Sequence, residues 1–367
     1  MTKKMTTTLL LFAVLSLVSI GIIMVYSTSS IYALRSYHDE YYFLKKQLLF
    51  ASAGVLLLIV VTRFPYQYLA KLAYPILALC SLGLALLFIP NVGVCLGGAT
   101  RWLRLGPLTI QPSEAAKLGL IIYLSYFLSK KKENIKNFSF GFLPPFVITG
   151  IISFLILCQP DFGTAFLLMT IFFILLFVAG ARVILLILSV ILLAPLGMLL
   201  ILNSPYRLKR FLAFLDPWSD PTGSGFQIIQ SYLAFGSGGL FGLGLGDGRQ
   251  KLFYLPEAHT DFIFSVVGEE LGLLGVMAVI ILFFTIVFCG IIIALRARDL
   301  LGTFLAVGLV SLIGAQALIN MGVVMGLLPT KGSTLPFISY GGSSLMVNLA
   351  GVGMLLNISS QGRASER

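Results

Sequence analysis

Residues 262–295 read F-I-F-S-V-V-G-E-E-L-G-L-L-G-V-M-A-V-I-I-L-F-F-T-I-V-F-C-G-I-I-I-A-L, a run in which Glu269 and Glu270 are the only charges. A helix needs about 20 predominantly apolar residues to cross the hydrocarbon core of a bilayer. This run is therefore long enough to span a membrane, and it predicts a transmembrane helix.

The rest of the chain has the same character. Of its 367 residues, 58% are hydrophobic and 11% are charged, and the mean hydropathy is +1.00. Soluble domains carry about 25% charged residues. Further apolar runs lie near residues 8–26, 47–62, 68–90, 113–129, 143–158, 162–180, 182–202, 302–327 and 340–357. We therefore predict an all-α polytopic membrane protein with about ten transmembrane helices, forming one transmembrane domain over residues 1–367.

The positions of Lys and Arg predict which side of the membrane each short loop occupies, because cytoplasmic loops are enriched in these residues. With an even number of spans, the following basic residues share the side of both termini: Lys3, Lys4, Arg63, Lys71, Lys130–Lys132, Lys136, Arg182, Arg296, Arg298, Arg363 and Arg367. We therefore expect both termini to be cytoplasmic. These clusters also account for much of the formal net charge of +11. Because they are expected to meet anionic headgroups, nucleic acid is not expected as a partner.

Two longer segments, 91–112 and 203–261, fall on the outer side in this arrangement. The second forms a large extracytoplasmic loop between the seventh and eighth expected helices. Its stretch F-G-S-G-G-L-F-G-L-G-L-G-D-G (235–248) superficially resembles a phosphate-binding glycine loop, but no strand or βαβ unit accompanies it. Close packing of backbone against backbone explains these glycines better.

The stretch Y-L-P-E-A-H-T-D places Glu257, His259 and Asp261 directly before the run at 262–295. Asp261 or Thr260 is suited to cap the following helix, because a short oxygen-bearing side chain accepts hydrogen bonds from exposed backbone amides. Asp261 is equally suited to act as a general base at the membrane boundary. Glu257 and His259 could orient or tune it, or form a hydrated loop pair.

Glu269 and Glu270 lie about 12 Å further into the same helix at 1.5 Å per residue. A charge near the middle of a bilayer costs about 3 kcal/mol or more unless it is paired or hydrated. Two successive residues should point in different directions, so at least one should face a polar cavity or a cation. A structural ion pair and the lining of a substrate cavity are both compatible with the sequence.

The outer segments also collect positive charge, and an anionic ligand is the simplest reason for it. Arg101, Trp102 and Arg104 could form a platform for a phosphate and a sugar, because Arg binds phosphate oxygens bidentately. An ordinary surface loop is the alternative. Arg210 and Lys331 add further positive charge, and Lys331 could instead be an interfacial anchor.

Other polar residues are interpreted as structural. Glu114 and Lys117 have the spacing of an ion pair on one helical face. Asp161, in the turn C-Q-P-D-F-G, is interpreted as a helix cap. The four cysteines have no metal-binding spacing, and the sequence leaves a disulfide between Cys95 and Cys158 open.

Several motifs together make the chain similar to a known family. They are G-G-A-T-R-W-L-R-L-G-P-L-T-I-Q-P-S-E, Q-P-D-F-G-T-A, D-P-W-S-D-P-T-G-S-G-F-Q, Y-L-P-E-A-H-T-D-F-I-F-S-V-V-G-E-E-L-G and L-P-T-K-G-S-T-L-P-F-I-S-Y-G-G-S-S-L. Over nearly its whole length the chain resembles the SEDS family (shape, elongation, division and sporulation). Lys331 and the E-A-H-T-D motif favour the cell-division branch over the elongation branch.

This resemblance implies ten transmembrane helices and peptidoglycan glycosyltransferase activity at the outer face of the bacterial cytoplasmic membrane, at the division septum. The acceptor would be lipid II, and the donor a glycan on undecaprenyl diphosphate, transferred with inversion. The essential aspartate of the family falls on Asp261, which would be the general base. The other residues expected at the substrate are Arg101, Trp102, Arg104, Arg210, Glu257, His259, Glu269 and Lys331.

The same resemblance implies a class B penicillin-binding transpeptidase and other division proteins as partners. It assigns no cofactor with certainty and leaves a divalent cation open. Three alternatives also stay open: an elongation-type polymerase, a transporter that flips lipid II, and a non-catalytic scaffold. A transporter predicts dependence on Glu269 and Glu270 and tolerance of Asp261→Asn.

Overall fold

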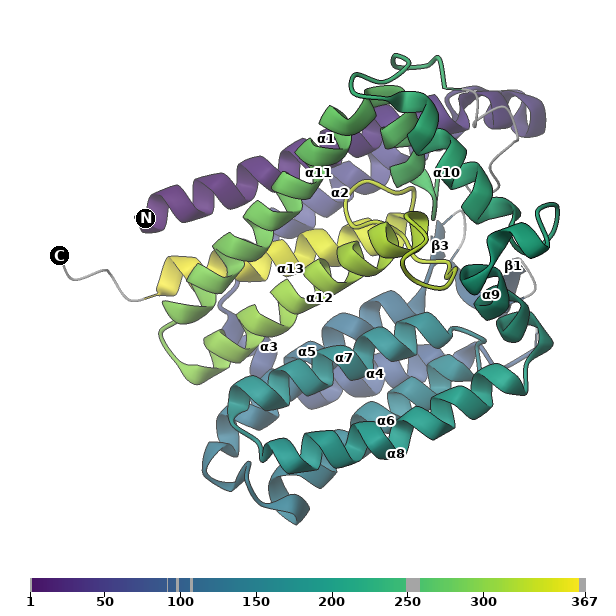
Figure 1. Ribbon diagram of the computed structural model, residues 1–367. Helices are drawn as coiled ribbons and strands as arrows, with labels where there is room; N and C mark the ends of the chain where they lie inside the picture. Colours follow the sequence, from purple (N-terminus) through teal and green to yellow (C-terminus); the bar gives the residue numbers. More distant parts are fainter. Residues whose placement is uncertain (1, 91, 97–98, 106–107, 249–257, 363–367) are drawn as a thin grey trace.

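The computed structural model describes residues 2–90, 92–96, 99–105, 108–248 and 258–362, and it is mostly helical (Figure 1). Its helices are α1 (Lys3–Tyr37), α2 (Tyr42–Arg63), α3 (Tyr66–Lys71), α4 (Ala73–Leu86), α5 (Pro112–Lys130), η1 (Lys132–Asn134), η2 (Phe138–Phe142), α6 (Leu143–Leu157), α7 (Phe162–Ala179), α8 (Val183–Leu202), α9 (Pro205–Leu215), η3 (Pro217–Ser219), α10 (Phe226–Gly238), α11 (Ile263–Leu295), α12 (Leu300–Val324) and α13 (Gly342–Gln361).

Eight helical segments of the described chain are long and apolar enough to cross a membrane: α1, α2, η2 with α6, α7, α8, α11, α12 and α13. The other two expected spans coincide with further helices. One is divided into α3 and the 14-residue α4, and the other is α5, which carries Glu114 and Lys117 within its length. The prediction of a polytopic helical membrane protein is confirmed, and the count of ten spans stays a prediction.

The helices form two groups joined by α12. Helices α1, α2, α11 and α13 pack together on one side, and α4 to α8 pack together on the other (Figure 1). Helix α12 contacts α11 in the first group and α5 and α7 in the second. Helix α8 lies at the edge of the second group. Only 11% of its 18-residue apolar stretch is buried, as expected for a helix that faces lipid.

The segment before α5 contains a small antiparallel sheet that was not predicted. It consists of β1 (Gly93–Leu96), β2 (Ala99–Leu105) and β3 (Leu108–Ile110), in the order β1-β2-β3. Val94 pairs with Trp102, and Arg104 pairs with Thr109. Successive residues of a strand point to opposite faces, so β2 presents Arg101 and Arg104 on opposite faces of the sheet.

The segment between α8 and α11 is largely ordered where it is described. Helix α10 packs along α11, and Ser231 Oγ donates a hydrogen bond to the Val324 carbonyl at 2.6 Å. This contact ties the segment to the end of α12. Its location outside the membrane stays a prediction.

Helix α11 is broken at Gly272, which has φ 66° and ψ −165°. The glycine-rich segment after α10 runs beside the break and forms backbone hydrogen bonds with the α11 residues on both sides of it. The bonds are Leu273 N to Gly239 O, Leu274 N to Leu240 O, Leu243 N to Glu269 O and Gly244 N to Glu270 O, at 2.9–3.2 Å. These bonds satisfy backbone groups that have no water partner inside a membrane. They also confirm the predicted close packing of backbone against backbone at these glycines.

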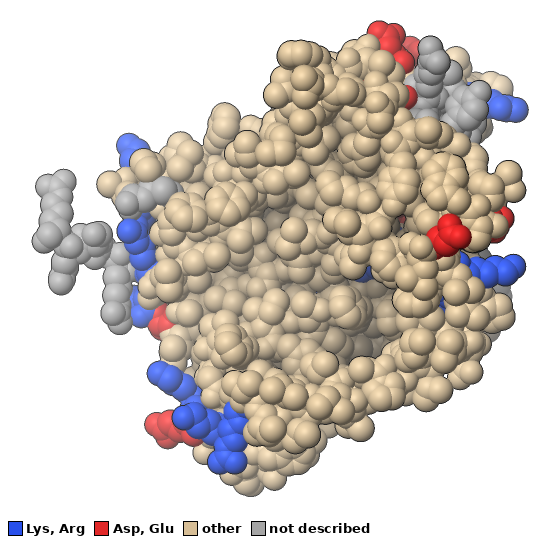
Figure 2. Space-filling view, in the orientation of Figure 1, with Lys and Arg blue, Asp and Glu red and all other residues tan. Residues whose placement is uncertain are grey.

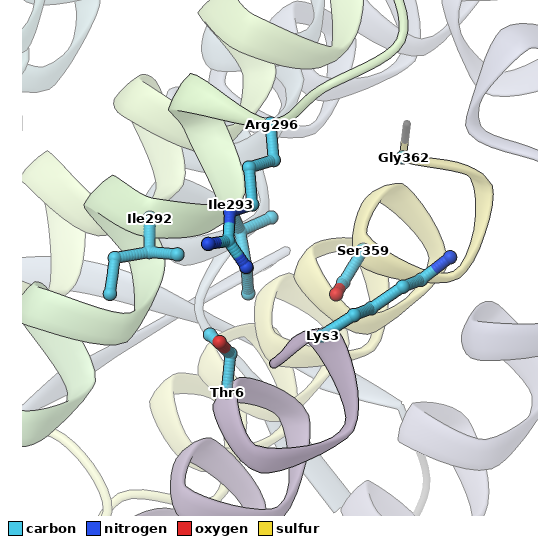
Figure 3. A pocket seen from close by; sticks show the side chains of 7 residues that line it. All are labelled: Lys3, Thr6, Ile292, Ile293, Arg296, Ser359 and Gly362. Carbon is cyan, nitrogen blue, oxygen red and sulfur yellow. The ribbon is translucent and has the colours of Figure 1, made fainter. Parts of the chain in front are cut away.

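Both ends of the chain lie at the same end of the bundle (Figure 1), where Lys and Arg side chains gather (Figure 2). A pocket of about 20 Å³ lies here between α1, α11 and α13, and Lys3 and Arg296 are among its lining residues (Figure 3). Lys3 Nζ donates to the Ser360 carbonyl at 2.5 Å. The pocket has room for about one water molecule, so it is not a substrate site.

Candidate active site

Asp261 lies at the opposite end of the bundle, directly before α11. The backbone around it is held by α12 and by the segment between α12 and α13. Tyr340 N donates to His259 O at 3.0 Å, Ser339 Oγ to Thr260 O at 2.5 Å, and Asn320 Nδ2 to Asp261 O at 2.9 Å. Asn320 also donates to the Ser333 carbonyl at 2.5 Å, so one buried amide joins the two segments that carry Asp261 and Lys331.

Helix α11 begins at Ile263, and Phe262 occupies its N-cap without a side-chain hydrogen bond. The prediction that Thr260 or Asp261 caps this helix is therefore wrong. The apolar Phe262 is only 3% exposed and belongs to the core, and the helix starts two residues after Asp261.

Gly332, next to Lys331 in the segment between α12 and α13, faces Asp261. A Cβ atom added at Gly332 would lie 2.8 Å from Asp261 Oδ2, so the carboxylate lies against the backbone next to Lys331. The side chain of Lys331 then crosses the first turn of α7. A Cβ atom at Gly163 would overlap the Cγ, Cδ and Cε atoms of Lys331.

Asp161 also lies in this neighbourhood. Its carboxylate accepts hydrogen bonds from Thr164 N at 3.0 Å and from Thr164 Oγ1 at 2.8 Å, so its predicted role as the cap of α7 is confirmed. Burial of Lys331 lowers the pKa of its amine to about 8, although the negative charges of Asp161, Glu114 and Asp261 act in the opposite direction. Lys331 therefore lies on the start of α7, within range of the charge of Asp261.

A buried polar network lies beneath these residues. Lys117 Nζ is 2.8 Å from Glu114 Oε1, and both side chains are almost fully buried. This is the ion pair predicted from their spacing. Lys117 also donates to Gln316 Oε1 at 3.3 Å, and Gln316 Nε2 donates to the Thr334 carbonyl at 3.1 Å. The network therefore connects α5 and α12 to the segment that carries Lys331.

The arginines expected at the substrate occupy different positions. Arg210, on α9, contacts the Thr330 carbonyl through Nη1 at 3.5 Å and is therefore next to Lys331. Arg101 donates to the carbonyls of Gln159 at 3.1 Å and Pro160 at 2.6 Å, so it holds the turn before Asp161.

Arg104 is exposed on β2, and Trp102 is half-buried beside it in the strand. Because Arg101 and Arg104 point to opposite faces of β2, the structure does not bring them together as one platform.

His259 packs among aromatic rings. Its ring centroid is 4.9 Å from that of Phe43 and 5.9 Å from those of Tyr32 and Tyr340. These contacts orient the backbone before Asp261. Glu257 lies outside the described residues. No group of three His, Cys, Asp or Glu side chains suited to a metal ion occurs in the described part of the chain, and the side chain of Cys95 is not described.

Glu269 and Glu270 are each 1% exposed. Ser27 Oγ, on α1, is 2.7 Å from both carboxylate oxygens of Glu270. A Cβ atom at Gly248 would lie 2.8 Å from Glu269 Oε2 and 3.1 Å from Glu270 Oε1. Both carboxylates therefore face the glycine-rich segment, whereas different directions were expected. The break at Gly272 places that segment beside α11 and allows this arrangement.

Ser27→Ala is expected to lower the free energy of unfolding by about 1.5–3 kcal/mol, because it removes a hydrogen bond to a buried carboxylate. Ser29→Ala is the matched control, since Ser29 is buried on the same helix and its hydroxyl donates to the Val25 carbonyl of that helix, at 2.6 Å. Thermal unfolding of both variants in detergent measures the difference. Equal losses of stability would show that the Ser27 hydroxyl has no special role.

Comparison with known proteins places this architecture in a family. The sequence profile of the family described as "Cell cycle protein", which covers FtsW, RodA and SpoVE, matches residues 7–364. The chain belongs to this family.

Members of the FtsW, RodA and SpoVE family resemble the chain over nearly its full length. "Probable peptidoglycan glycosyltransferase FtsW" of Geobacter metallireducens is 51% identical over 353 residues, which cover 96% of this chain and 94% of the relative. "Stage V sporulation protein E" of Bacillus subtilis is 46% identical over 367 residues, which cover 99% of both chains.

Solved structures of the family share the fold. A chain from a structure described as "Structural coordination of polymerization and crosslinking by a peptidoglycan synthase complex" superposes with a TM-score of 0.78 at 32% identity, and 96% of each chain is covered. The rod shape determining protein RodA of Thermus thermophilus has a TM-score of 0.69 at 28% identity, covering 98% of this chain and 97% of that one.

Sequence reasoning did not identify Asn320, Gln316 or Gly163 as residues of the candidate site. A signal was present for the first two, because polar side chains four residues apart on an apolar helix share one face and are costly in a membrane unless they have a function. No local signal marked Gly163, since its contact with Lys331 joins distant parts of the chain.

Proposed function

We propose that this protein is a peptidoglycan glycosyltransferase that polymerises lipid II into glycan strands. The observation that carries the proposal is the position of the Asp261 carboxylate against Gly332, next to Lys331. A carboxylate that lies against the segment carrying a lysine suits a reaction that removes a proton and releases an anion. The names of the FtsW relatives support the same reaction class.

In the proposed reaction, Asp261 accepts the proton of the 4-hydroxyl on the acceptor's GlcNAc. The oxygen then attacks the anomeric carbon of the donor's MurNAc. The new glycosidic bond forms with inversion while the bond to the diphosphate oxygen breaks, and undecaprenyl diphosphate leaves with the electron pair. A general base at this step accounts for about 10²–10⁴-fold of the rate.

The leaving diphosphate gains negative charge, and cationic groups fixed at that point lower the barrier. We assign this role to Lys331 and to Arg210, which contacts the carbonyl before Lys331. Arg104 is exposed and suited to reach the diphosphate or sugar from the sheet, with Trp102 as its neighbour. Arg101 acts indirectly in this scheme, because its hydrogen bonds hold the turn that carries Asp161.

The remaining expected residues take supporting roles in the proposal. His259 fixes the approach to Asp261 through its aromatic neighbours. Glu269 is buried beside the glycine-rich segment, and we assign it a supporting role beneath the site. Glu257 completes the acidic cluster of the sequence motif.

We further propose that the site faces outward from the bacterial cytoplasmic membrane, that both termini are cytoplasmic and that the protein acts at the division septum. The Lys and Arg side chains at the end with both termini support this orientation (Figure 2). A class B penicillin-binding transpeptidase is the proposed partner. The likeness to a chain of a peptidoglycan synthase complex that coordinates polymerisation with crosslinking supports that partnership.

Purified protein reconstituted with its cognate transpeptidase tests the proposal. Lipid II supplied on both faces of the vesicle should be converted into glycan strands. Movement of labelled lipid II between the leaflets without strand formation would contradict it and favour the transporter, whose path would then run past the buried Glu269 and Glu270.

The pH dependence of kcat/KM tests the role of Lys331. Burial lowers the pKa of its amine from 10.5 to about 8, so the free enzyme loses this positive charge as the pH rises through that value. We expect kcat/KM for lipid II to fall above pH 8, and Lys331→Met to abolish this decline in whatever activity remains. The same decline in Lys331→Met would assign the titration to another group.

A further inference from the structure

A hollow of about 520 Å³ lies at the end of the bundle that carries both termini, away from the candidate active site. The side chains that line it are Glu133, Asn134, Lys136, Asn137, Phe138 and Arg182. The connection between α5 and α6 supplies all of them except Arg182, which is the N-cap residue of α8. Basic and acidic side chains gather at the lower left of Figure 2, where this connection lies.

The lining has the chemistry of an anion site. Lys136 and Arg182 form no ion pair or side-chain hydrogen bond with other residues of the described chain. Asn137 uses its carbonyl oxygen to accept from Ser139 N at 3.0 Å, which leaves its amide hydrogens as donors. Glu133 offsets one positive charge, so the lining keeps a net positive charge.

Helix α8 also begins at the hollow, since Arg182 is its N-cap residue, and α8 has no acidic residue in its first turn. The N-terminus of a helix carries a partial positive charge that favours anions. This contribution adds to that of the two basic side chains.

The surroundings of the hollow are apolar and exposed. Phe138 is 52% exposed, Phe140 65%, Phe177 63% and Ile184 57%. Phe138 lines the hollow, and the other three lie close to lining residues in the sequence, at the ends of membrane-spanning segments. Aromatic side chains at such ends mark the headgroup level of a bilayer. A ligand bound here would therefore have its charged group in the hollow and acyl chains along the apolar rim.

We propose that this hollow binds the phosphate of an anionic phospholipid. The site is separate from the proposed glycosyltransferase site, so the proposal does not depend on that activity. The ligand chemistry is a phosphate group, and the apolar rim assigns it to a lipid headgroup and not to a soluble phosphate.

Native mass spectrometry of the full-length protein, titrated with phosphatidylglycerol or phosphatidylcholine in neutral detergent, tests this site. We expect wild type to retain one phosphatidylglycerol, and Lys136→Gln/Arg182→Gln to bind it roughly 10–30-fold more weakly, as two lost cation contacts predict. The matched control is Lys131→Gln/Lys132→Gln, which removes the same charge from exposed neighbours that do not line the hollow.

Equal weakening in both double variants would overturn the proposal, because diffuse attraction to the basic surface would then explain binding. Competition by millimolar inorganic phosphate, with no preference for the lipid, would overturn the assignment to a lipid headgroup. Thermal unfolding checks that both variants fold, and loss confined to the lining pair supports the site.

Discussion

Asp261→Asn is expected to reduce the rate of glycan strand synthesis about 10²–10⁴-fold, the range that a general base contributes. The amide keeps the shape of the side chain but has a far lower affinity for a proton, so the acceptor hydroxyl loses its base. The Asn320 bond to the backbone carbonyl of residue 261 does not involve the side chain, so the local backbone should be preserved. Strand formation from lipid II, separated on gels over time, measures the rate.

Asp39→Asn is the matched control for this substitution. Asp39 is a carboxylate outside the membrane-spanning segments that pairs with Lys45 at 2.8 Å, and it has no contact with the candidate site among the described residues. Its activity should stay close to that of wild type. A similar loss in both variants would indicate a general effect of removing acidic charge.

Gly163→Ala is expected to reduce activity by about 10²-fold or more, because misplacement of a catalytic group by about 1 Å can cost that much. The added methyl group would occupy the space of the Lys331 stem. That stem is flexible, so the lysine moves while the helix stays in place. Alanine is also a better helix former than glycine by about 1 kcal/mol. Activity should therefore fall without a loss of thermal stability.

Gly150→Ala in α6 is the control, because a Cβ atom there meets nothing within 4 Å. Mass spectrometry of amine labelling supplies a second measurement, since a displaced Lys331 should react faster in Gly163→Ala than in wild type or the control. Unchanged labelling together with unchanged activity would contradict the placement of Lys331 over Gly163.

The apolar runs predicted the helices well, because a membrane-spanning helix requires a continuous run of apolar residues. The Glu114–Lys117 pair and the Asp161 cap were also predictable, since both depend on spacing of three residues within one helix. The start of α11 was predicted wrongly. Asp and Thr are preferred at N-cap positions, but the buried Phe262 occupies the N-cap of this helix.

The rest depended on contacts between distant segments. The passage of the glycine-rich segment along the break at Gly272 requires two parts of the chain to meet. The position of Lys331 on Gly163 is of the same kind. The stretch T-R-W-L-R-L of β2 has no strict polar–apolar alternation, and three short strands pair only after the loop has folded. Motifs therefore identified the polar residues, and the structure showed which of them face one another.

The most direct test of the central claim is a single-turnover measurement of undecaprenyl diphosphate released from lipid II by the purified protein with its transpeptidase partner. One molecule should be released for each glycosidic bond formed by the wild type, with release slowed about 10²–10⁴-fold in Asp261→Asn although that variant still binds lipid II. Release at the wild-type rate from Asp261→Asn would contradict the assignment of Asp261 as the base. Absence of release from the folded wild-type complex would contradict the proposed activity.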